Sequence, residues 1–347
     1  MLRTIFTLFL LGLTSLPGQS TPLALEEWKL ALAGDIMLGS DFPENRLPPN
    51  QGAGLLDAAA SSLQWADIAI GNHEGTLTSG GVSSKQGCTR CYAFRTPPSF
   101  AHLLRQAGFD AMSMANNHAR DFGQQGLVNT EQALAKAGIS STGWAGSSPA
   151  FINHAGRRAC LLAYAPNRGM NDIRNISVMT QHVRQARSQC HLVIVSFHGG
   201  AEGASKTSTP MGVETYLGEN RGDVRAFSRS AIDAGAHLVF GHGPHVPRGM
   251  ELYQGHMIAY SLGNFMTYGG MNVSGVLGQA PLLLVKLDGQ GRVINGRILS
   301  FRQTRMSPLG LDPNMEAAKT MIRMTQKDFG GGNLVFTHDG GFFPKQN

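Results

Sequence analysis

Two kinds of hydrophobic pattern alternate along the chain. Short, largely apolar runs predict buried strands, and apolar residues recurring every three or four positions predict amphipathic helices. The predicted strands lie at 29–38, 66–72, 109–115, 158–165, 191–199, 236–242, 256–265, 281–287 and 293–301. The predicted helices lie at 54–66, 99–108, 125–138 and 223–235, with a further helical stretch at 314–330. This alternation of strands and helices predicts a layered α/β protein.

Turn and capping residues add detail to this pattern. Ser99 is predicted to cap the start of the second helix, and Gly108 to end it. The last three strands are predicted to be antiparallel and linked by hairpins. The segments 203–222 and 266–281 are long and contain several glycines. This favours functional or disordered loops over packed structure.

The composition allows a sizeable folded core and limits the choice of partner. Of 347 residues, 42% are hydrophobic and 15% are charged, and 44 are glycine, which is typical of a compact, loop-rich α/β protein. The formal charge is +6, but the chain has no dense Lys/Arg run and no interleaving of basic and aromatic residues. Nucleic-acid binding is therefore not expected. The mild basicity favours an anionic polymer or a membrane surface, although solubility explains it more simply.

The stretch 1–20 has the three-part plan of a secretory signal peptide. Arg3 is followed by an apolar run over Ile5–Leu13 and then by a small, turn-forming segment that ends at Ser20. The apolar run is too short to span a bilayer comfortably. We expect cleavage near Ser20 and export to the periplasm or the extracellular space. The alternative is a buried amino-terminal strand.

Export changes how the four cysteines are interpreted. Cys88 and Cys91 form a Cys-Thr-Arg-Cys motif and could pair in an oxidising compartment. Cys160 and Cys190 lie beside strand-like runs, where free buried thiols or a second bridge would both fit. A structural zinc is disfavoured because the motif lacks a second ligand pair at suitable spacing. A redox motif is disfavoured because no β-α-β pattern surrounds it.

Polar and metal-binding residue types lie at or just after the carboxyl ends of five of the predicted strands. They are Asp35; Asn72, His73 and Glu74; Asn116, Asn117, His118 and Asp121; His198 and Glu202; and His242 and His245. The carboxyl ends of strands in an α/β sheet gather at one edge, where ligands bind. We therefore expect these distant segments to converge on one pocket.

The residue types in this set suit a divalent metal. Imidazoles and carboxylates together fit Zn, Fe or Mn, whereas Mg alone prefers oxygen ligands. Two ions a few ångströms apart would activate a water and hold both the attacked and the leaving oxygens. Asp35 or Glu74 could bridge two ions, and Asn117 offers a neutral oxygen. His118 could protonate a leaving group.

Each of these residues also has a structural interpretation. Asp35 could cap a turn, Gly-Asn-His-Glu could form an ordinary turn, and His198 could be a hydrogen-bonded core histidine. The Gly-His-Gly-Pro-His motif at 241–245 is the most specific signal, because it places two imidazoles on one turn. Histidines without such placement are interpreted as surface or structural residues. They are His102, His154, His182, His191, His237 and His256.

Taken together, these segments resemble the poly-γ-glutamate capsule-synthesis (CapA-type) family, which looks like a branch of the calcineurin-like metallophosphoesterases. The matching stretches include LAGDIMLG, ADIAIGNHEGTLT, MANNHARDFG, VIVSFHGGAE, GAHLVFGHGPHV and IAYSLGNFM, in family order over residues 29–266. The resemblance implies two packed β-sheets flanked by helices. It implies a family domain at 29–301 and a carboxyl-terminal extension at 302–347.

The resemblance also implies roles for individual residues. The implied metal ligands are Asp35, Glu74, Asn117, His198, His242 and His245. His118 would be the proton donor. The residues implied to orient these groups are Asn72, His73, Asn116, Asp121 and Glu202. The chain departs from the phosphoesterase pattern at Met37, which replaces a ligand histidine, and at Gly-Asn-His-Glu, which replaces a paired-Asp motif.

The family resemblance implies a role in synthesis, export or processing of a capsule or envelope polymer. Activity would be metal-assisted hydrolysis or transfer on a γ-glutamyl or phosphorylated substrate, with membrane-bound capsule-synthesis proteins as partners. One alternative is a non-catalytic accessory protein that binds an anionic polymer. Another is a metal-dependent phosphoesterase unrelated to capsule. Phosphodiester turnover that is abolished by His242→Ala would separate an enzyme from an accessory.

Overall fold

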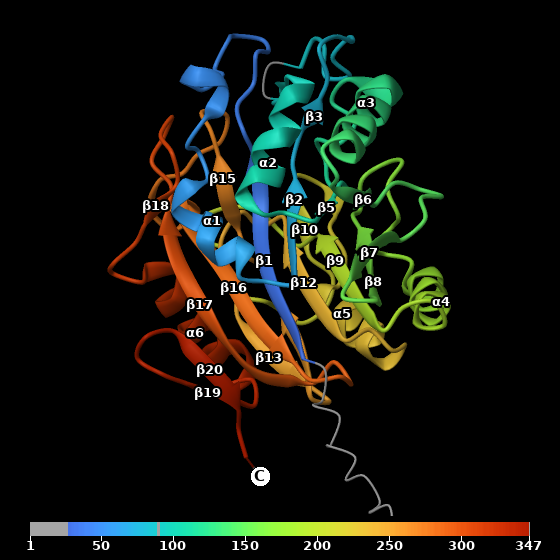
Figure 1. The fold of residues 1–347 in the computed structure, drawn as a ribbon, viewed down its shortest axis with the longest axis vertical. Coiled ribbons are helices and arrows are strands. Elements are labelled where there is room, and N and C mark those ends of the chain that lie inside the picture. Colours follow the sequence, from blue (N-terminus) through green and yellow to red (C-terminus); the bar gives the residue numbers. More distant parts are fainter. Residues whose placement is uncertain (1–26, 89–90, 347) are drawn as a thin grey trace, which may run out of the picture.

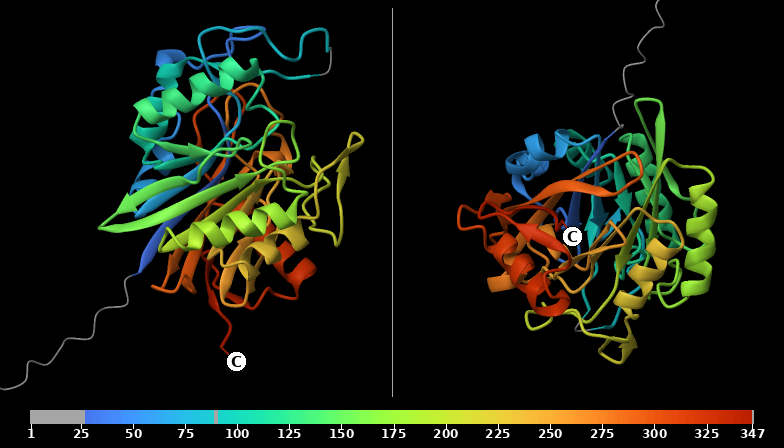
Figure 2. Two further views of the ribbon diagram at one scale, coloured as in Figure 1. Left: turned by 90° about the vertical axis from the view of Figure 1, so that its right-hand side faces the viewer. Right: turned by 90° about the horizontal axis from the view of Figure 1, so that it is seen from below.

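The computed structural model describes residues 27–88 and 91–346. In this part of the chain two large β-sheets pack face to face, and helices cover their outer faces (Figures 1 and 2). The layered α/β architecture predicted from the sequence is therefore confirmed. The predicted signal peptide at 1–20 lies outside the described residues. Among the residues described, no helix combines the length and the apolar character needed to span a membrane.

The first large sheet has ten strands. They are β1 (Trp28–Met37), β2 (Ile68–His73), β5 (Ala111–Ser113), β6 (Ser140–Thr142), β15 (Asn264–Thr267), β16 (Gln279–Leu287), β17 (Val293–Arg302), β18 (Gly310–Leu311), β19 (Leu334–Phe336) and β20 (Gly341–Pro344). The order is β19-β20-β17-β16-β1-β2-β5-β6, with β15 beside β1 and β18 beside β17. Strand β1 is parallel to β2 and β15 and antiparallel to β16.

The second large sheet has six strands. In spatial order they are β13 (Met250–Tyr253), β14 (His256–Ala259), β12 (Leu238–His242), β9 (Leu192–His198), β8 (Arg157–Tyr164) and β7 (Ala150–His154). The inner four strands are parallel. Two short ribbons complete the described strands. They are β3 (Thr76–Leu77) with β4 (Arg95–Thr96), and β10 (Thr215–Tyr216) with β11 (Glu219–Asn220).

Helices cover the outer faces of both sheets, as Figure 1 shows. The ten-stranded sheet is covered by α1 (Asp57–Gln64), α2 (Ala101–Ala107) and α3 (Gly123–Lys136), and the six-stranded sheet by α4 (Ile176–Arg187) and α5 (Val224–Asp233). Helix α6 (Glu316–Phe329) contacts β17 of one sheet and β13 of the other. Short 3-10 helices are η1 (Pro49–Gly52), η2 (Pro98–Phe100) and η3 (Gly275–Gly278).

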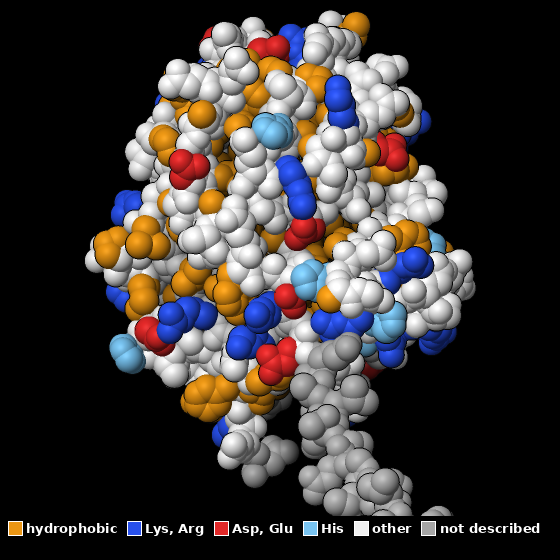
Figure 3. Space-filling model, viewed as in Figure 1, with side chains coloured by type: hydrophobic (Ala, Val, Ile, Leu, Met, Phe, Trp, Pro, Cys, Tyr) orange, Lys and Arg blue, Asp and Glu red, His pale blue; other side chains and the backbone are white. Residues whose placement is uncertain are grey.

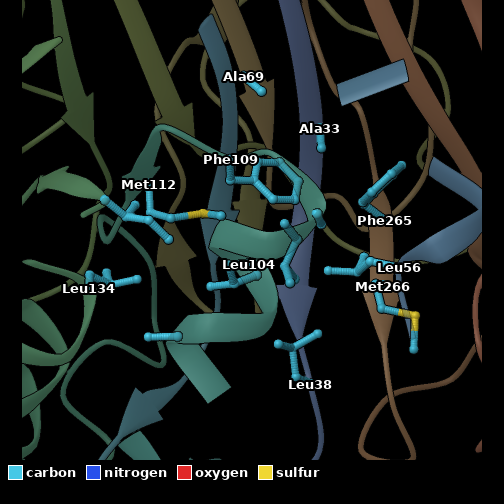
Figure 4. Close-up of a cluster of buried hydrophobic side chains, with 14 of the residues drawn as sticks. Ala33, Leu38, Leu56, Ala69, Leu104, Phe109, Met112, Leu134, Phe265 and Met266 are labelled. Carbon is cyan, nitrogen blue, oxygen red and sulfur yellow. The ribbon is translucent and has the colours of Figure 1, made fainter. Parts of the chain in front are cut away.

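Three apolar clusters hold these layers together. Along β1, alternate side chains point to opposite faces. Leu30 and Leu32 therefore join the cluster between the sheets, and Ala31 and Ala33 join the cluster under the helices. Figure 4 shows the latter, where Phe109 lies among side chains from strands and helices. Both faces of β1 are buried, which explains its nearly continuous apolar sequence.

The strand predicted at 256–265 is wrong as a single element. The structure divides it into β14, which is parallel to β12 in one sheet, and β15, which is parallel to β1 in the other. The chain crosses between the sheets at 261–263. Gly263 has φ of 57°, and a Cβ there would approach the backbone of Val246 at 2.9 Å. The predicted antiparallel hairpin is confirmed for β16 and β17.

The predicted amino-terminal cap of the second helix is also wrong. Ser99 lies inside η2, and α2 begins at Ala101 without a side-chain cap. The preceding Pro97 and Pro98 favour a tight 3-10 turn here, because proline fixes φ near its helical value. Gly108 ends α2 with φ of 117°, as predicted.

All four cysteines are paired, and no free cysteine occurs among the described residues. One disulfide joins Cys88 to Cys91, and the other joins Cys160 to Cys190. The second links β8 to the residues just before β9 and lies in the apolar cluster under α4 and α5. Of the two interpretations of Cys160 and Cys190, the structure therefore selects the bridge.

Candidate metal centre

The strand ends that the sequence singles out lie together between the two sheets. In the ten-stranded sheet, Asp35 on β1 is in register with Asn72 on β2 and with Asn264 on β15. In the six-stranded sheet, His198 on β9 is in register with His242 on β12. The face-to-face packing brings these two sets of side chains into contact.

A local irregularity in β1 places Asp35 at this junction. The register between β1 and β2 shifts between Leu32 and Asp35, and such bulges redirect side chains near functional sites. Gly34 lies against the crossing segment, where any Cβ would overlap the carbonyl oxygen of Gly263. The Asp35 amide donates to that same oxygen at 2.9 Å. Glycine at position 34 is therefore required for Asp35 to reach the site.

The Asp35 carboxylate is the hub of the cluster. Its Oδ1 accepts a hydrogen bond from Asn72 Nδ2 at 2.8 Å and lies 3.2 Å from His242 Nδ1 and 3.7 Å from His198 Nδ1. Its Oδ2 lies 2.9 Å from His245 Nδ1. Burial acts to raise the pKa of Asp35, but the three imidazoles hold it well below its usual range. Asp35 is therefore ionised.

His198 and His242 form the deeper half of the cluster. Their Nδ1 atoms are 3.1 Å apart, and His242 Nε2 lies 2.9 Å from Ser196 Oγ. Without a cation, His242 Nδ1 donates its proton to Asp35. With the proton on Nε2 and accepted by Ser196, Nδ1 would present its lone pair to a cation beside Asp35 and His198. Burial lowers the pKa of His198 to about 3, so this imidazole is neutral. Asp35, His198 and His242 can each supply one ligand atom, all within 4.8 Å of one another.

His245 and Glu74 form the shallower half. His245 Nδ1 lies 2.9 Å from Asp35 Oδ2 and 3.0 Å from Asn264 Oδ1, so it donates its proton to these acceptors. This leaves Nε2 at 3.9 Å from Glu74 Oε1 and 3.8 Å from Glu202 Oε2. Glu74, His198 and His245 make a second group whose ligand atoms lie within 4.8 Å of one another. His198 belongs to both groups.

His245 also has an unusual backbone and charge. Its φ is 59°, a left-handed conformation that costs of order 1–3 kcal/mol and clusters at functional sites. Burial acts to lower the pKa of His245, but the negative charges of Glu74, Asp35 and Glu202 raise it to about 10. Protonated His245 thus offsets an excess of negative charge at this end of the cluster.

Several buried polar atoms of the cluster have no hydrogen-bond partner within the described part of the chain. They are both carboxylate oxygens of Glu74, Oδ1 of Asn117 and Nε2 of His198. Burial and the nearby charge of Asp35 raise the pKa of Glu74 well above its usual value. Leaving such groups without a partner is costly. These oxygen and imidazole donors fit a divalent ion such as Mn, Fe or Zn.

His118 borders this cluster from the loop after β5. Its Nδ1 lies 2.8 Å from Asp121 Oδ2, and its Nε2 lies 4.0 Å from Glu74 Oε1. Lys85 Nζ lies 3.1 Å from the same Nδ1, but it also approaches Asp121 Oδ1 at 2.6 Å and donates to the carbonyl of Tyr92 at 2.7 Å. We therefore assign the Nδ1 proton to the bond with Asp121, so Nε2 faces the cluster.

The predicted orienting residues differ in what they contact. Asn116 Nδ2 donates to Asn72 Oδ1 at 3.1 Å and to the His73 carbonyl at 2.8 Å, and so ties the loop after β5 to the end of β2. Glu202 pairs with Arg221 at 2.9 Å. The His73 ring is buried on the other side of β2, and its nitrogens have no partner among the described residues. Burial lowers the pKa of His73 to about 4.

Four residues at the site were missed from the sequence. Ser196 is two positions before His198, and this spacing places both on one face of β9, so its position was detectable. Asn264 follows Gly263 in the crossing segment. Lys85 and Arg221 lie in loops, where no periodic pattern marks them. Their positive charges come within reach only because the loops fold back over the strand ends.

A cleft of about 520 Å³ opens over the shallower half of the cluster. Asn117, His118, Glu202, Arg221 and His245 line it. Asp35, His198 and His242 are fully buried beneath. A ligand in this cleft would meet the Glu74–His245 side first. On the face seen in Figure 3, acidic and basic side chains are interspersed and do not form a field of one sign.

The fold and the site define a mixed α/β sandwich with a carboxylate–imidazole cluster at its strand ends. The chain belongs to the bacterial capsule synthesis protein family PGA_cap, whose model matches residues 29–268. This confirms the family resemblance found in the sequence motifs. Family membership supports a capsule-related role.

Curated relatives agree with this assignment. The chain is 25% identical over 263 residues to the capsule biosynthesis protein CapA of Bacillus anthracis, covering 70% of this chain and 60% of that protein. It is 25% identical over 253 residues to the PGA biosynthesis protein CapA of Bacillus subtilis, covering 68% and 62%. It is 28% identical over 309 residues to a probable polyglutamine synthesis accessory protein of Mycobacterium tuberculosis, covering 79% and 73%. The chain thus spans about three fifths of the Bacillus relatives.

Two of the solved structures that match this chain share little sequence with it. The calcineurin-like phosphoesterase YfkN from Bacillus subtilis has a TM-score of 0.46 and 9% identity, covering 88% of this chain and 97% of that one. The 5'-nucleotidase precursor from Thermus thermophilus has a TM-score of 0.46 and 12% identity, covering 87% and 59%.

Proposed function

We propose that this protein is an exported, metal-dependent hydrolase or transferase in the synthesis, export or processing of a capsule or envelope polymer. Its substrate would carry a phosphorylated or γ-glutamyl group. The observation that carries the proposal is the buried Glu74 carboxylate, which has no hydrogen-bond partner among the described residues and faces His245 at 3.9 Å. Burial and Asp35 raise the pKa of Glu74, which keeps its carboxyl protonated without metal, and a bound cation would let it ionise beside Asp35.

Six side chains would hold one or two divalent ions. They are Asp35, Glu74, Asn117, His198, His242 and His245. When bound, the metal would supply Lewis-acid polarisation of the substrate and activation of water. Ser196 would accept the Nε2 proton of His242 and so direct the Nδ1 lone pair of that ring toward the metal. Asn264 would accept the Nδ1 proton of His245 and so direct its Nε2 lone pair toward the metal.

His118 is placed to transfer a proton to a leaving group. Asp121 accepts its Nδ1 proton at 2.8 Å, which leaves Nε2 directed toward the cluster. Burial lowers the pKa of His118 more than the Asp121 carboxylate raises it. The neutral imidazole would therefore take a proton at Nε2 and release it to the leaving group in the same site.

Two further observations support export and the polymer pathway. Both disulfides are of the kind that persists in oxidising compartments outside the cytosol. The relatives are named for capsule or polyglutamine synthesis. These names support a capsule-type polymer as partner. We propose in addition that this polymer is anionic and that membrane-bound capsule-synthesis proteins are further partners.

The first test is elemental analysis of purified protein, wild type beside His242→Ala. We expect about one or two transition-metal equivalents in the wild type and their loss in the variant. His102→Ala, at an exposed histidine of α2, is the matched control and should keep the metal. Absence of metal from the wild type as well would overturn the proposal.

The second test separates catalysis from accessory binding. Turnover of a phosphodiester or a γ-glutamyl peptide by the metal-loaded protein, lost in His118→Ala with metal retained, supports an enzyme. Polymer export that depends on the protein, without turnover of either substrate class, supports the accessory function instead.

A further inference from the structure

The cleft over the cluster combines a polar base with apolar walls. Its apolar lining residues are Tyr92, Phe94, Tyr216, Leu217, Met271 and Leu277. They come from three segments that are remote in sequence. Two of these segments, 203–222 and 266–281, are the glycine-containing stretches whose length favours functional loops. Both stretches therefore contribute apolar side chains to the lining of the cleft.

Leu217 is held at the edge of the cleft in a position unsuited to leucine. It is 89% exposed and lies in the two-residue turn between β10 and β11. Leu217 and Gly218 have φ of 48° and 81°. Two positive φ angles are typical of a type I′ turn, where Asn-Gly is preferred. The turn alone does not explain a leucine here, whereas an apolar ligand does.

A second part of the cleft lining is aromatic and leads from solvent to the cluster. Tyr92 is 63% exposed, and its ring stacks on Phe94 with centroids 6.4 Å apart. Phe94 is buried, and its ring lies 4.4 Å from the His118 imidazole. Lys85 fixes the Tyr92 carbonyl by a hydrogen bond of 2.7 Å. An apolar group on this surface would lie beside His118.

We propose that the cleft selects an amphiphilic substrate. Its polar or anionic reacting group would lie at the Glu74–His245 side, and an aromatic or alkyl group would pack against Tyr92, Phe94 and Leu217. Because His118 is the proposed proton donor, this apolar group belongs to the leaving group. The inference rests on the proposed function and narrows its substrate class. A purely ionic chain would gain nothing from burying these side chains.

Two phosphonates with the same head group test this selectivity. Calorimetric titration of the Mn²⁺-loaded protein should show phenylphosphonate binding about tenfold tighter than methylphosphonate, because burial of one ring is worth at least that ratio. The double variant Tyr92→Ser/Leu217→Ser should reduce the ratio to about one. Both sites are exposed, so the variant is expected to fold. Leu311→Ser, at a leucine on β18 that is 68% exposed, is the control and should keep the wild-type ratio.

The outcomes distinguish this inference from the proposed function. Equal affinity of the wild type for both phosphonates overturns the inference and leaves the metal site intact. If neither phosphonate binds, the phosphorylated-substrate form of the proposed function fails, and fluorescence of 1-anilinonaphthalene-8-sulfonate tests the apolar walls alone. Enhancement that is equal in wild type and His242→Ala, and lost in the double variant, supports an apolar site. Enhancement that survives in the double variant overturns it.

Discussion

The two ends of β12 each carry a buried histidine, and their surroundings are opposite. His237, just before the strand, accepts a hydrogen bond from the Val193 amide at 2.8 Å. His242, at the carboxyl end, lies between Ser196, Asp35 and His198. Burial is similar at both ends. What separates the two histidines is their neighbours: His237 is bonded to a backbone amide and lies near Arg187 and His256, whereas His242 lies among candidate metal-ligand side chains.

Two buried glutamates repeat this contrast. Glu214 forms two hydrogen bonds of 2.8 Å with Arg248 and accepts from the Ala201 amide at 3.0 Å. Glu74 has no hydrogen-bond partner among the described residues for either oxygen. A fully paired buried charge stabilises local structure, whereas an unpaired one indicates a missing cation or a strained functional group. For these two glutamates, hydrogen-bond satisfaction distinguishes the paired residue from the candidate ligand, whereas burial does not.

The largest effect is expected for Glu74→Gln in the metal-free protein. Because the folded state holds the Glu74 proton above its unfolded pKa of about 4.5, wild-type stability falls as pH rises from that value toward the raised folded pKa. The loss is about 1.4 kcal/mol per pH unit. Glutamine cannot ionise. The stability of the variant relative to the wild type should therefore increase from pH 5 to pH 8 when a chelator keeps the protein free of metal. Thermal unfolding at both pH values measures this gain.

Glu214→Gln is the matched comparison and should act in the opposite direction. It leaves the buried Arg248 guanidinium without its carboxylate, which costs about 3–5 kcal/mol.

Added Mn²⁺ should raise the melting temperature of the wild type more than that of Glu74→Gln. Destabilisation by Glu74→Gln at pH 8 in chelator would show that Glu74 is a paired structural residue.

A smaller effect is expected for Ser196→Ala. Removing the hydroxyl 2.9 Å from His242 Nε2 leaves that ring free to reorient. Loss of a partner that orients a metal-ligating histidine typically weakens metal affinity by about 10–100-fold. Competition titration with a chelating dye measures the change. Ser228→Ala on α5 is the control, because its buried hydroxyl has no partner among the described residues. Unchanged affinity in Ser196→Ala would remove His242 from the ligand set.

The sequence predicted the position of the site better than its details. Strand-end placement was enough to bring Asp35, His198 and His242 together, because parallel strands end at one edge and the two sheets face each other. The metal-ligand roles of these residues stay predictions. Lys85 and Arg221 were missed because loops have no regular sequence repeat from which the direction of a side chain can be predicted. His73 follows Asn72 on β2, and neighbouring side chains of a strand point to opposite faces, so His73 points away from the cluster. The Gly-Asn-His-Glu motif alone does not show this.

The fold was predicted in outline, and its errors have physical causes. The strand at 256–265 was predicted as one element because the apolar pattern continues across Ser261–Gly263, and only the close backbone contact at Gly263 reveals the crossing. Helix α4 was missed although Asn175 caps it by accepting from the Val178 amide. The exposed face of α4 is rich in polar residues, so the helical periodicity of its apolar residues is weak in the sequence. Edge strands such as β7 and β13 are short or partly exposed, so they give little signal.

The smallest effect at neutral pH is expected for His237→Asn, which tests the structural end of β12. Asparagine Oδ1 can accept from the Val193 amide as His237 Nδ1 does, so stability at pH 7.5 should change by less than about 1 kcal/mol. At lower pH the two proteins should differ. Burial, with the neighbouring Arg187 and His256, lowers the pKa of His237 to about 3. Below the unfolded pKa of about 6.5 only the unfolded wild type takes up this proton.

Wild-type stability should therefore fall with decreasing pH between about 6.5 and 3, by about 1.4 kcal/mol per unit from this residue. At pH 5 the variant should gain about 2 kcal/mol on the wild type relative to pH 7.5, as measured by urea midpoints. His102→Asn, at an exposed histidine, should leave that difference unchanged. Equal pH slopes in wild type and His237→Asn would mean that His237 is protonated in the fold, and the contrast between the two ends of β12 would then rest on hydrogen bonding alone.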